Sequence, residues 1–354
     1  MGPVSEPSRI PRTPRTGGRG RLARYTAAFA VLCGLIAYVA VHHITGSKGA
    51  PTCTVGSGEN TYEFTPEQAA NAATISAVGT TRRMPERAVT IALATALQES
   101  ALRNIEHGDR DSLGLFQQRP SMGWGTPAEI MDPVYSSRKF YEGLAKVPGY
   151  SRLPLTVAAQ KVQRSGFPQA YAKHEPDAAL LAAALTGRSA ASLSCTTSSL
   201  ETGEPGDPAK VRAELVRAFG EKAAPRTTAG GGERGEGSEG SADAGTGGSA
   251  DAGAGSSPGG GAGGNAGGGG ADAKAGAAPA PAVISVPVLA TSGTDAQRGW
   301  ELAHWAVARA DDLRIAEVAY ADMVWRASDT SGTWTRSRTA DAADDGSVRI
   351  RLER

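Results

Sequence analysis

The sequence predicts a mainly α-helical protein, in which one transmembrane helix precedes a helical domain, a Gly-rich disordered linker and a small α+β C-terminal module. Three observations support this prediction. An uncharged apolar run follows an arginine-rich tail, helix-start signals recur between two cysteines, and the composition shifts to Gly, Ala and Ser in the last third of the chain.

The N-terminal residues predict a membrane anchor. Residues 1–24 form a basic tail, broken by Pro and Gly, that we expect to be disordered and cytoplasmic. The apolar run within 25–44 is just long enough for a single-pass transmembrane helix, which needs about 20 residues. Because the arginines precede this run, the rest of the chain should be extracellular, outside the cell membrane. A cleaved signal peptide is the alternative, but no small-residue cleavage site follows cleanly.

Two cysteines delimit the predicted helical domain over 53–195. Cys53 follows the apolar run, and Cys195 follows the last strong helical pattern. In an oxidising exterior the two should form a disulfide. Closing a loop of about 140 residues gives about 4 to 5 kcal/mol of stabilisation in the chain-entropy model. The alternative is two unrelated free thiols.

Helix-start signals divide this domain into helices. Thr65 is a predicted N-cap, Pro66 takes the first helical position, and Gln68 completes a capping box. Further helix starts are predicted at Pro85, Asp132-Pro133, Thr156, Pro168 and Pro176. Apolar residues at helical spacing in these segments predict one shared core.

The chain changes character twice after this domain. Residues 196–226 form a connector with one amphipathic helix at Pro208–Phe219. Residues 227–282 cannot bury enough apolar surface to fold and are expected to be a disordered linker. Residues 283–354 recover a mixed composition, with one predicted helix and two predicted strands, over 299–310, 318–325 and 348–352.

Charge and motifs exclude several classes of function. The formal net charge is +1, and acids and bases are interspersed after the tail, which argues against binding to nucleic acid. No phosphate-binding glycine motif follows a predicted strand, and no His/Cys pair has metal-ligand spacing. No cofactor and no metal are therefore expected.

The most informative residue is Glu99, at the end of an Ala-rich helix. A carboxylate at the C-terminal end of a helix, beside apolar neighbours, has its charged form disfavoured. Its pKa then rises, as a general acid requires. Ala92 and Ala96, on the same side, leave room for another segment to pack beneath the carboxylate. The alternative is a glutamate that points into water.

An ordered set of motifs around Glu99 resembles those of the lysozyme-like superfamily. The motifs are Glu99-Ser100, Gly114-Leu115-Phe116-Gln117, Ala158-Ala159-Gln160 and Tyr171. The most similar members are lytic transglycosylases and goose-type lysozymes, which cut the glycan strands of peptidoglycan. The resemblance covers about residues 60–190 and implies a lysozyme-like helical domain.

The resemblance also implies roles for individual residues. Glu99 would be the general acid for the β-1,4 glycosidic oxygen, and then the base. Ser100 would orient the carboxylate or the substrate, Gly114 would let the backbone approach the sugar, and Gln117 would line the cleft. The later motif is matched only loosely, at Gln160, Gln163 and Tyr171, of which the first and last are carried over as substrate-binding candidates.

Two features of the predicted cleft stay open. Most glycosidases use two carboxylates; Asp109 or Asp111 could be the second, or both could serve a polar turn. A transglycosylase needs only one acid, because the substrate's own hydroxyl or acetamido group attacks. The single clear acid therefore favours non-hydrolytic cleavage with an anhydro product. Trp124, between two glycines, either stacks on a sugar or belongs to the core.

The C-terminal module over 283–354 resembles one appended to actinobacterial cell-wall hydrolases. No His follows His304, so metal chemistry is not expected there, and the module should bind the wall or a cell-wall protein partner. The leading interpretation is a membrane-anchored enzyme that cleaves peptidoglycan glycan strands. The alternatives are a catalytically inactive wall-glycan-binding protein with the same fold, and a membrane-tethered scaffold.

Overall fold

The computed structural model describes residues 29, 31–33, 50–164, 169–197, 205–228, 282–290, 293–337 and 346–354. The chain divides into two units, Met1–Pro51 and Thr52–Arg354. The predicted basic tail over 1–24 lies outside the described residues, as does almost all of the predicted linker over 227–282. The predicted domain over 53–195 and the predicted module over 283–354 both fall within the second unit.

The predicted transmembrane helix over 25–44 was wrong, and the single-pass location in the cell membrane is corrected with it. In the part of the chain that the structure describes, no helix combines the length and the apolar composition needed to cross a bilayer. Residues 29 and 31–33 are helical, and the rest of the predicted segment lies outside the described residues.

The mainly α fold class was also wrong, because the second unit is α+β with two antiparallel sheets. The smaller sheet has the order β2-β1-β3, formed by β1 (Cys53–Ser57), β2 (Asn60–Phe64) and β3 (Leu193–Cys195). The predicted disulfide between Cys53 and Cys195 is confirmed. The two cysteines lie directly opposite each other in the β1–β3 register, so the cross-link fastens the two ends of the predicted domain over 53–195.

Two buried helices follow the first hairpin, α2 (Pro66–Thr81) and α3 (Glu86–Ser100). The predicted capping box of α2 is confirmed, since the Thr65 side chain accepts from the Gln68 backbone N–H and the Gln68 side chain accepts from the Thr65 N–H. Almost every residue of α3 up to Leu97 is buried, which fixes the position of its C-terminal end.

Four more α-helices lie between α3 and β3. They are α4 (Pro127–Ile130), α5 (Pro133–Ala145), α6 (Leu155–Gln163) and α7 (Glu175–Leu185), with short 3-10 turns η1 (Pro120–Met122), η2 (Tyr150–Arg152) and η3 (Ala170–His174). Asp132 caps α5 as predicted, through Val134 N–H and Tyr135 N–H. The predicted cap at Thr156 was wrong, because α6 begins at Leu155 after Pro154.

The larger sheet has six strands in the order β4-β5-β9-β6-β7-β8, all antiparallel. Its strands are β4 (Arg226–Thr228), β5 (Val283–Pro287), β6 (Ile315–Tyr320), β7 (Met323–Arg326), β8 (Thr335–Arg336) and β9 (Ser347–Leu352). The single strand predicted over 318–325 is instead a hairpin of β6 and β7. Ala321 adopts a left-handed conformation (φ 51°) at the turn between them.

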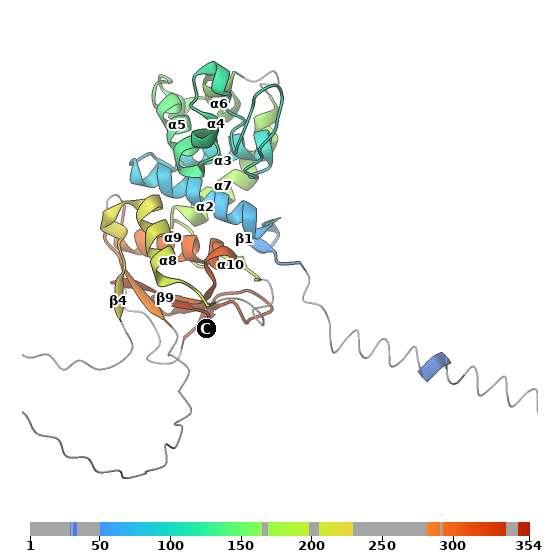
Figure 1. Cartoon of the computed structure of the whole chain (residues 1–354), viewed down its shortest axis with the longest axis vertical. Helices are drawn as coiled ribbons and strands as arrows, with labels where there is room; N and C mark the ends of the chain where they lie inside the picture. Colours follow the sequence, from blue (N-terminus) through green and yellow to red (C-terminus); the bar gives the residue numbers. More distant parts are fainter. Residues whose placement is uncertain are drawn as a thin grey trace, which may run out of the picture. The chain divides into compact units, whose positions relative to one another are not determined.

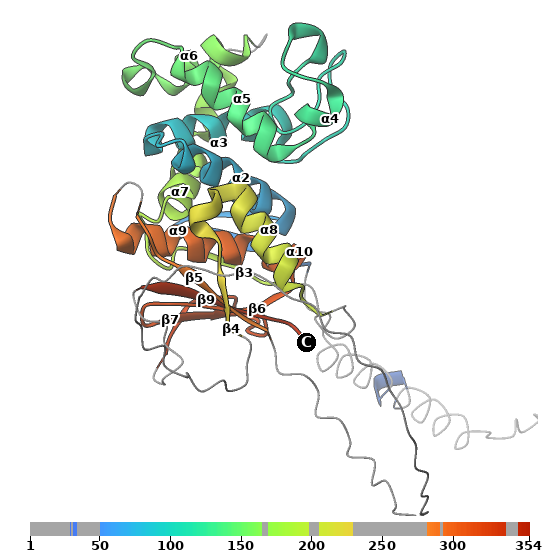
Figure 2. The ribbon, with the colours of Figure 1, turned by 60° about the vertical axis from the view of Figure 1, so that its left-hand side comes forward.

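Helix α9 (Asp295–Ala308) lies between two parts of the unit, which are the helical part formed by α2 to α7 and the larger sheet (Figure 1). It packs against α2 and α7 on one side and against β6 and β9 on the other, as Figure 2 also shows. The connector helix α8 (Pro208–Phe219), followed by η5 (Glu221–Ala223), packs on α2, and α10 (Ala310–Leu313) follows α9.

Hydrogen bonds from the C-terminal segment fix the β3 strand and its disulfide. The indole N–H of Trp325 donates to the Cys195 carbonyl (3.1 Å), and that of Trp334 donates to the Leu193 carbonyl (2.8 Å). Buried His304 on α9 donates from Nδ1 to the Ala184 carbonyl (2.8 Å). These bonds satisfy buried polar groups of the helical part and of the C-terminal segment, so the two share one core.

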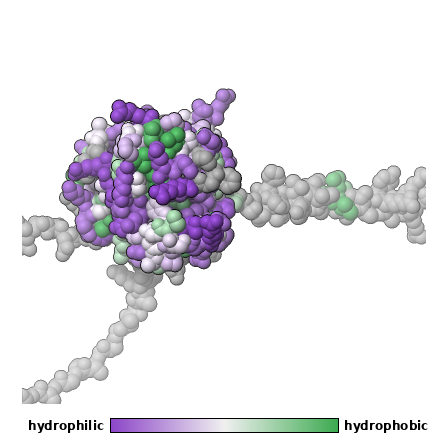
Figure 3. Space-filling model, turned by 90° about the horizontal axis from the view of Figure 1, so that it is seen from above, coloured by the Kyte–Doolittle hydropathy of each residue, from purple (hydrophilic) through white to green (hydrophobic). Residues whose placement is uncertain are grey.

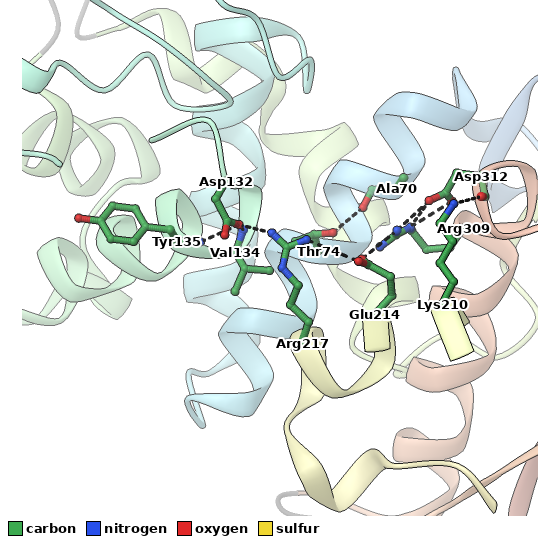
Figure 4. A network of polar contacts seen from close by, with 10 residues as sticks. All are labelled: Ala70, Thr74, Asp132, Val134, Tyr135, Lys210, Glu214, Arg217, Arg309 and Asp312. Atoms are coloured by element: carbon green, nitrogen blue, oxygen red, sulfur yellow. Dashed lines mark hydrogen bonds and ion pairs between the residues drawn. The ribbon is translucent and has the colours of Figure 1, made fainter. Parts of the chain in front are cut away.

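A polar network ties α8 to α5 and to α10 (Figure 4). The Arg217 guanidinium forms ion pairs with Asp132, the N-cap of α5 (Nη2 to Oδ1, 2.5 Å), and with Glu214 (Nη1 to Oε1, 3.6 Å). Arg309 pairs with Glu214 (3.0 Å) and with Asp312 (2.7 Å). The network holds the start of α5, the helix that forms one wall of the cleft described below.

Candidate active site

Glu99 lies in the last turn of α3, at a backbone turn of unusual conformation. The next two residues, Ala101 (φ 52°) and Leu102 (φ 59°), are both left-handed although neither is glycine. Such residues cost of order 1 kcal/mol each and persist where the surroundings over-determine them. Side chains of α2 hold this turn: Gln68 Nε2 donates to the Ala101 carbonyl and Asn71 Nδ2 to the Leu102 carbonyl, both at 2.8 Å.

The Glu99 carboxylate is half-buried and receives hydrogen bonds. The hydroxyl of buried Tyr171, in η3, donates to Glu99 Oε1 at 2.6 Å. The Gln163 side chain, at the end of α6, also hydrogen-bonds to the carboxylate. Burial raises the pKa of Glu99 above its ordinary value, and the hydrogen bonds from Tyr171 and Gln163 oppose this rise. The carboxyl group is therefore poised to hold and release a proton.

A cleft of about 880 Å³ opens beside Glu99. This volume lies within the range of small-molecule pockets, roughly 300 to 1,000 Å³. Of the predicted site residues, Glu99, Gln117 and Trp124 line the cleft, and Gln163 lines it as well. The walls come from the end of α3, the loop after it, and the C-terminal parts of α5 and α6.

Ser100 and Gly114 lie behind the cleft wall. The Ser100 hydroxyl is buried and donates to the carbonyls of Leu115 (2.8 Å) and Ala96 (3.1 Å), which fastens the 114–117 loop to α3. Gly114 is left-handed (φ 73°), and a Cβ there would lie 2.8 Å from the Ile130 carbonyl oxygen. Both residues shape the loop that carries Gln117, and neither is among the residues that line the cleft.

Gln117 closes the loop that faces Glu99. It is left-handed (φ 48°), and its Nε2 donates to the carbonyls of Gly114 (3.2 Å) and His107 (3.4 Å). The backbones of Leu113 and Gln118 pair on either side of it. This short turn presents the amide at the cleft surface.

Gln163 joins three parts of the site. Its Nε2 donates to the Phe116 carbonyl at 2.6 Å, so the amide bridges α6, the 114–117 loop and Glu99. The sequence resemblance selected Gln160, one turn earlier on α6, as the binding candidate, and Gln160 does not line the cleft. Both glutamines match the later motif only loosely, so the motif could not choose between them. What distinguishes Gln163 is its position as the last residue of α6.

The two loop aspartates take different positions. Asp111 accepts from Arg119 Nε (2.8 Å) and from the Ser121 backbone N–H (2.8 Å), and these hydrogen bonds hold the pKa of its carboxyl well below the usual range. Asp111 therefore serves the loop and does not line the cleft. Asp109 is exposed and lines the cleft with Glu99.

Trp124 is partly buried and lines the cleft at the same time. Its ring packs along α5, where a Cβ on Gly143 would lie 3.9 Å from the ring edge. Its carbonyl accepts from the Tyr135 hydroxyl at 3.2 Å. The Trp124 side chain therefore contacts α5 and also lines the cleft.

Neither protein-family models nor curated proteins show a match to this sequence. Within the described residues, no group of three or more His, Cys, Asp or Glu side chains is placed to hold a metal ion. What the site can do chemically therefore rests on a half-buried carboxyl group at a cleft lined by amides, one indole and charged side chains.

Proposed function

We propose that this protein cleaves the glycan strands of peptidoglycan by the one-acid route of lytic transglycosylases. The observation that carries the proposal is the carboxyl group of Glu99, half-buried at a cleft, with a raised pKa and a 2.6 Å hydrogen bond from Tyr171. The order of the motifs from Glu99 to Tyr171, which resembles that of the lysozyme-like superfamily, supports it.

Glu99 serves as acid and then as base in this reaction. The protonated carboxyl group gives its proton to the glycosidic oxygen while the bond between that oxygen and the anomeric carbon breaks. A hydroxyl of the same sugar then attacks the anomeric carbon, and its proton passes to the Glu99 carboxylate. The new intramolecular C–O bond gives an anhydro sugar and restores the protonated acid. Tyr171 and Gln163 stabilise the carboxylate between the two steps.

The engagement of Asp111 removes one of the two loop aspartates as a second catalytic carboxylate, because Asp111 is bound to Arg119 and Ser121. The other, Asp109, lines the cleft but is exposed, so Glu99 is the half-buried acid at the cleft. The same observation is compatible with a second function, a wall-glycan-binding protein that keeps the cleft without cleaving. Cleavage and binding must therefore be measured separately.

The test compares wild type with Glu99→Gln on purified peptidoglycan, with release of soluble muropeptides as the measurement. Loss of a general acid should reduce release by about a hundredfold or more. Glu106→Gln, an exposed glutamate outside the cleft, is the matched control and should retain wild-type release. Equal release by wild type and Glu99→Gln contradicts the catalytic role. Binding without release by the wild type favours the binding function.

A further inference from the structure

A second cavity lies where α2, the start of α5, α8 and α10 meet. Its volume is about 350 Å³, within the range of small-molecule pockets, roughly 300 to 1,000 Å³. Figure 4 shows part of its lining, with Glu214 and Arg217 of α8 beside Thr74 of α2. Among the described residues, none lines both this cavity and the cleft beside Glu99, so the two are separate sites.

Acidic side chains outnumber basic ones along this cavity, four to two. The acids are Glu67, Glu214, Asp311 and Asp312, and the bases are Arg217 and Arg309. Both arginines form ion pairs with Glu214, and each has a second acidic partner. Glu67 is exposed and has no ion-pair partner within the described part of the chain. The lining therefore favours a positively charged ligand over an anion.

Asn71 gives the cavity a free hydrogen-bond acceptor. This residue lines the cavity and is 9% exposed, and its Nδ2 donates to the Leu102 carbonyl at 2.8 Å. Its Oδ1 has no hydrogen-bond partner among the described residues, although polar groups of buried residues usually have one. Because Nδ2 is directed at Leu102, Oδ1 is the end of the amide left for a ligand. A carbonyl oxygen of this kind selects a ligand that carries an N–H or O–H donor.

Apolar residues form most of the remaining lining. They are Pro66, Ala70, Pro133, Val134 and Ala218. An alkyl stem that enters the cavity loses contact with water against these residues, which favours binding. Figure 3 looks onto the end of the molecule that carries α4, α5 and α6, where hydrophilic residues predominate, so an alkyl stem finds little competing apolar surface there.

We propose that this cavity binds a small organic cation, a primary ammonium group on a short alkyl stem, and that Asn71 transmits its binding to the turn after Glu99. The ammonium group donates to Asn71 Oδ1 while Asn71 Nδ2 donates to the carbonyl of Leu102, a left-handed residue of that turn. Hydrogen bonds in series polarise and strengthen one another. The site is independent of the proposed cleavage, because neither the ligand nor its binding involves a glycan.

Binding of three probes to the full chain, measured by isothermal titration calorimetry at low salt, tests the ligand chemistry. Pentylammonium has the charge and the N–H donors, pentyltrimethylammonium has only the charge, and 1-pentanol has only a neutral donor. Pentylammonium should bind at least about tenfold more tightly than either of the others. Equal binding of all three overturns the proposal. Tighter binding of Nα-acetyl-lysine methylamide than of pentylammonium would assign a lysine-like side chain, and not a free amine, as the source of the ammonium group.

Two variants with matched controls assign the binding to this cavity. Glu67→Gln should weaken binding of pentylammonium by about threefold and leave that of 1-pentanol unchanged. Glu59→Gln, in an exposed glutamate outside the cavity, should change neither. Ala70→Leu fills the cavity and should abolish binding, whereas Ala209→Leu, in an exposed alanine of α8 outside the cavity, should not. Equal effects within either pair overturn the location of the site.

Hydrogen exchange with and without saturating pentylammonium tests the transmission by Asn71. The Ala101 N–H donates to the Leu97 carbonyl (3.0 Å), and the Leu102 N–H donates to the Ala96 carbonyl (3.1 Å). Both should exchange at least about twofold more slowly when the cavity is occupied, and Ala70→Leu should show no such change. Binding with unchanged exchange in the turn overturns the transmission. Absence of binding overturns the site, whether or not the wild type releases muropeptides.

Discussion

Burial and hydrogen bonding act on the Glu99 carboxyl group in opposite directions. Burial raises its pKa, and the hydrogen bonds from Tyr171 and Gln163 lower it, with a net rise. A general acid works best when its pKa is near the working pH, because it must be protonated in one step and ionised in the next. In the proposed reaction, burial of Glu99 and the opposing hydrogen bonds from Tyr171 and Gln163 would together set the pH range.

Removal of the Tyr171 hydroxyl should move this range. Tyr171→Phe deletes a bond that stabilises the ionised carboxylate, so the pKa of Glu99 should rise further. Because protonated Glu99 starts the reaction, the alkaline limb of the kcat/KM profile should shift to higher pH. Tyr150→Phe, in a partly buried tyrosine that does not line the cleft, is the control and should leave the limb in place. An unchanged limb in Tyr171→Phe shows that this bond does not set the pKa of the acid.

Residue-level roles were only partly accessible from the sequence. Motif order pointed to Glu99 and Gln117, and both line the cleft. The resemblance assigned Ser100 and Gly114 to substrate, whereas the structure places both behind the wall, in bonds and contacts that shape the loop. Helical spacing could not show whether Gln160 or Gln163 lines the cleft, because the answer depends on where α6 ends.

At the scale of elements, the turn after α3 depends on α2. The Gln68 amide accepts from the Thr65 N–H within the capping box and also donates to the Ala101 carbonyl, just past Glu99. One side chain thus starts a helix and holds the left-handed turn that places the catalytic candidate. Neither sequence pattern nor helix propensity reveals the second of these bonds, since it joins residues 33 positions apart.

Gln68→Ala and Thr65→Ala separate these two functions. Thr65→Ala removes only the cap and should cost about 1 kcal/mol of unfolding free energy with kcat unchanged. Gln68→Ala also leaves the Ala101 carbonyl without its donor, so it should cost about 1 to 3 kcal/mol and lower kcat as the turn relaxes. Urea unfolding and initial rates on the same preparations measure both. Equal kcat in the two variants contradicts a role for Gln68 in placing Glu99.

Local signals predicted helices better than strands. Capping residues such as Thr65 and Asp132 bond within three positions, so the sequence shows them directly. The strands of the smaller sheet were missed because they are short, and β1 pairs with β3 across a separation of 142 residues at the disulfide. The β6–β7 hairpin was predicted as one strand because its turn uses Ala321, a residue that rarely adopts a left-handed backbone.

At the scale of the whole molecule, α9 joins the two parts of the second unit. His304 on α9 donates to the Ala184 carbonyl through Nδ1 and accepts from the Ser192 N–H through Nε2 (3.2 Å). This pattern fits the neutral imidazole, and burial lowers the pKa of His304 to about 4. The Gly-rich sequence between the two parts predicted a tether. Its composition could not indicate that α9 packs on the helical part on one side and on the larger sheet on the other.

His304 should make the unit less stable in acid. Its folded-state pKa is below the unfolded value, so its contribution is present above about pH 6.5 and is lost as the pH falls toward 4. The loss is on the order of 3 kcal/mol. His304→Gln cannot titrate, so the gap in unfolding free energy between wild type and variant should narrow from pH 7 to pH 4.5, as measured by urea unfolding. A constant gap contradicts a neutral buried His304.

The sugar ends released from purified peptidoglycan test the central proposal most directly. Mass spectrometry distinguishes anhydro ends from reducing ends, with Glu99→Gln as the blank. One-acid cleavage by Glu99 predicts anhydro ends from the wild type and none above background from the variant. Reducing ends in place of anhydro ends would contradict the intramolecular route, and the same anhydro ends from Glu99→Gln would contradict the role of Glu99.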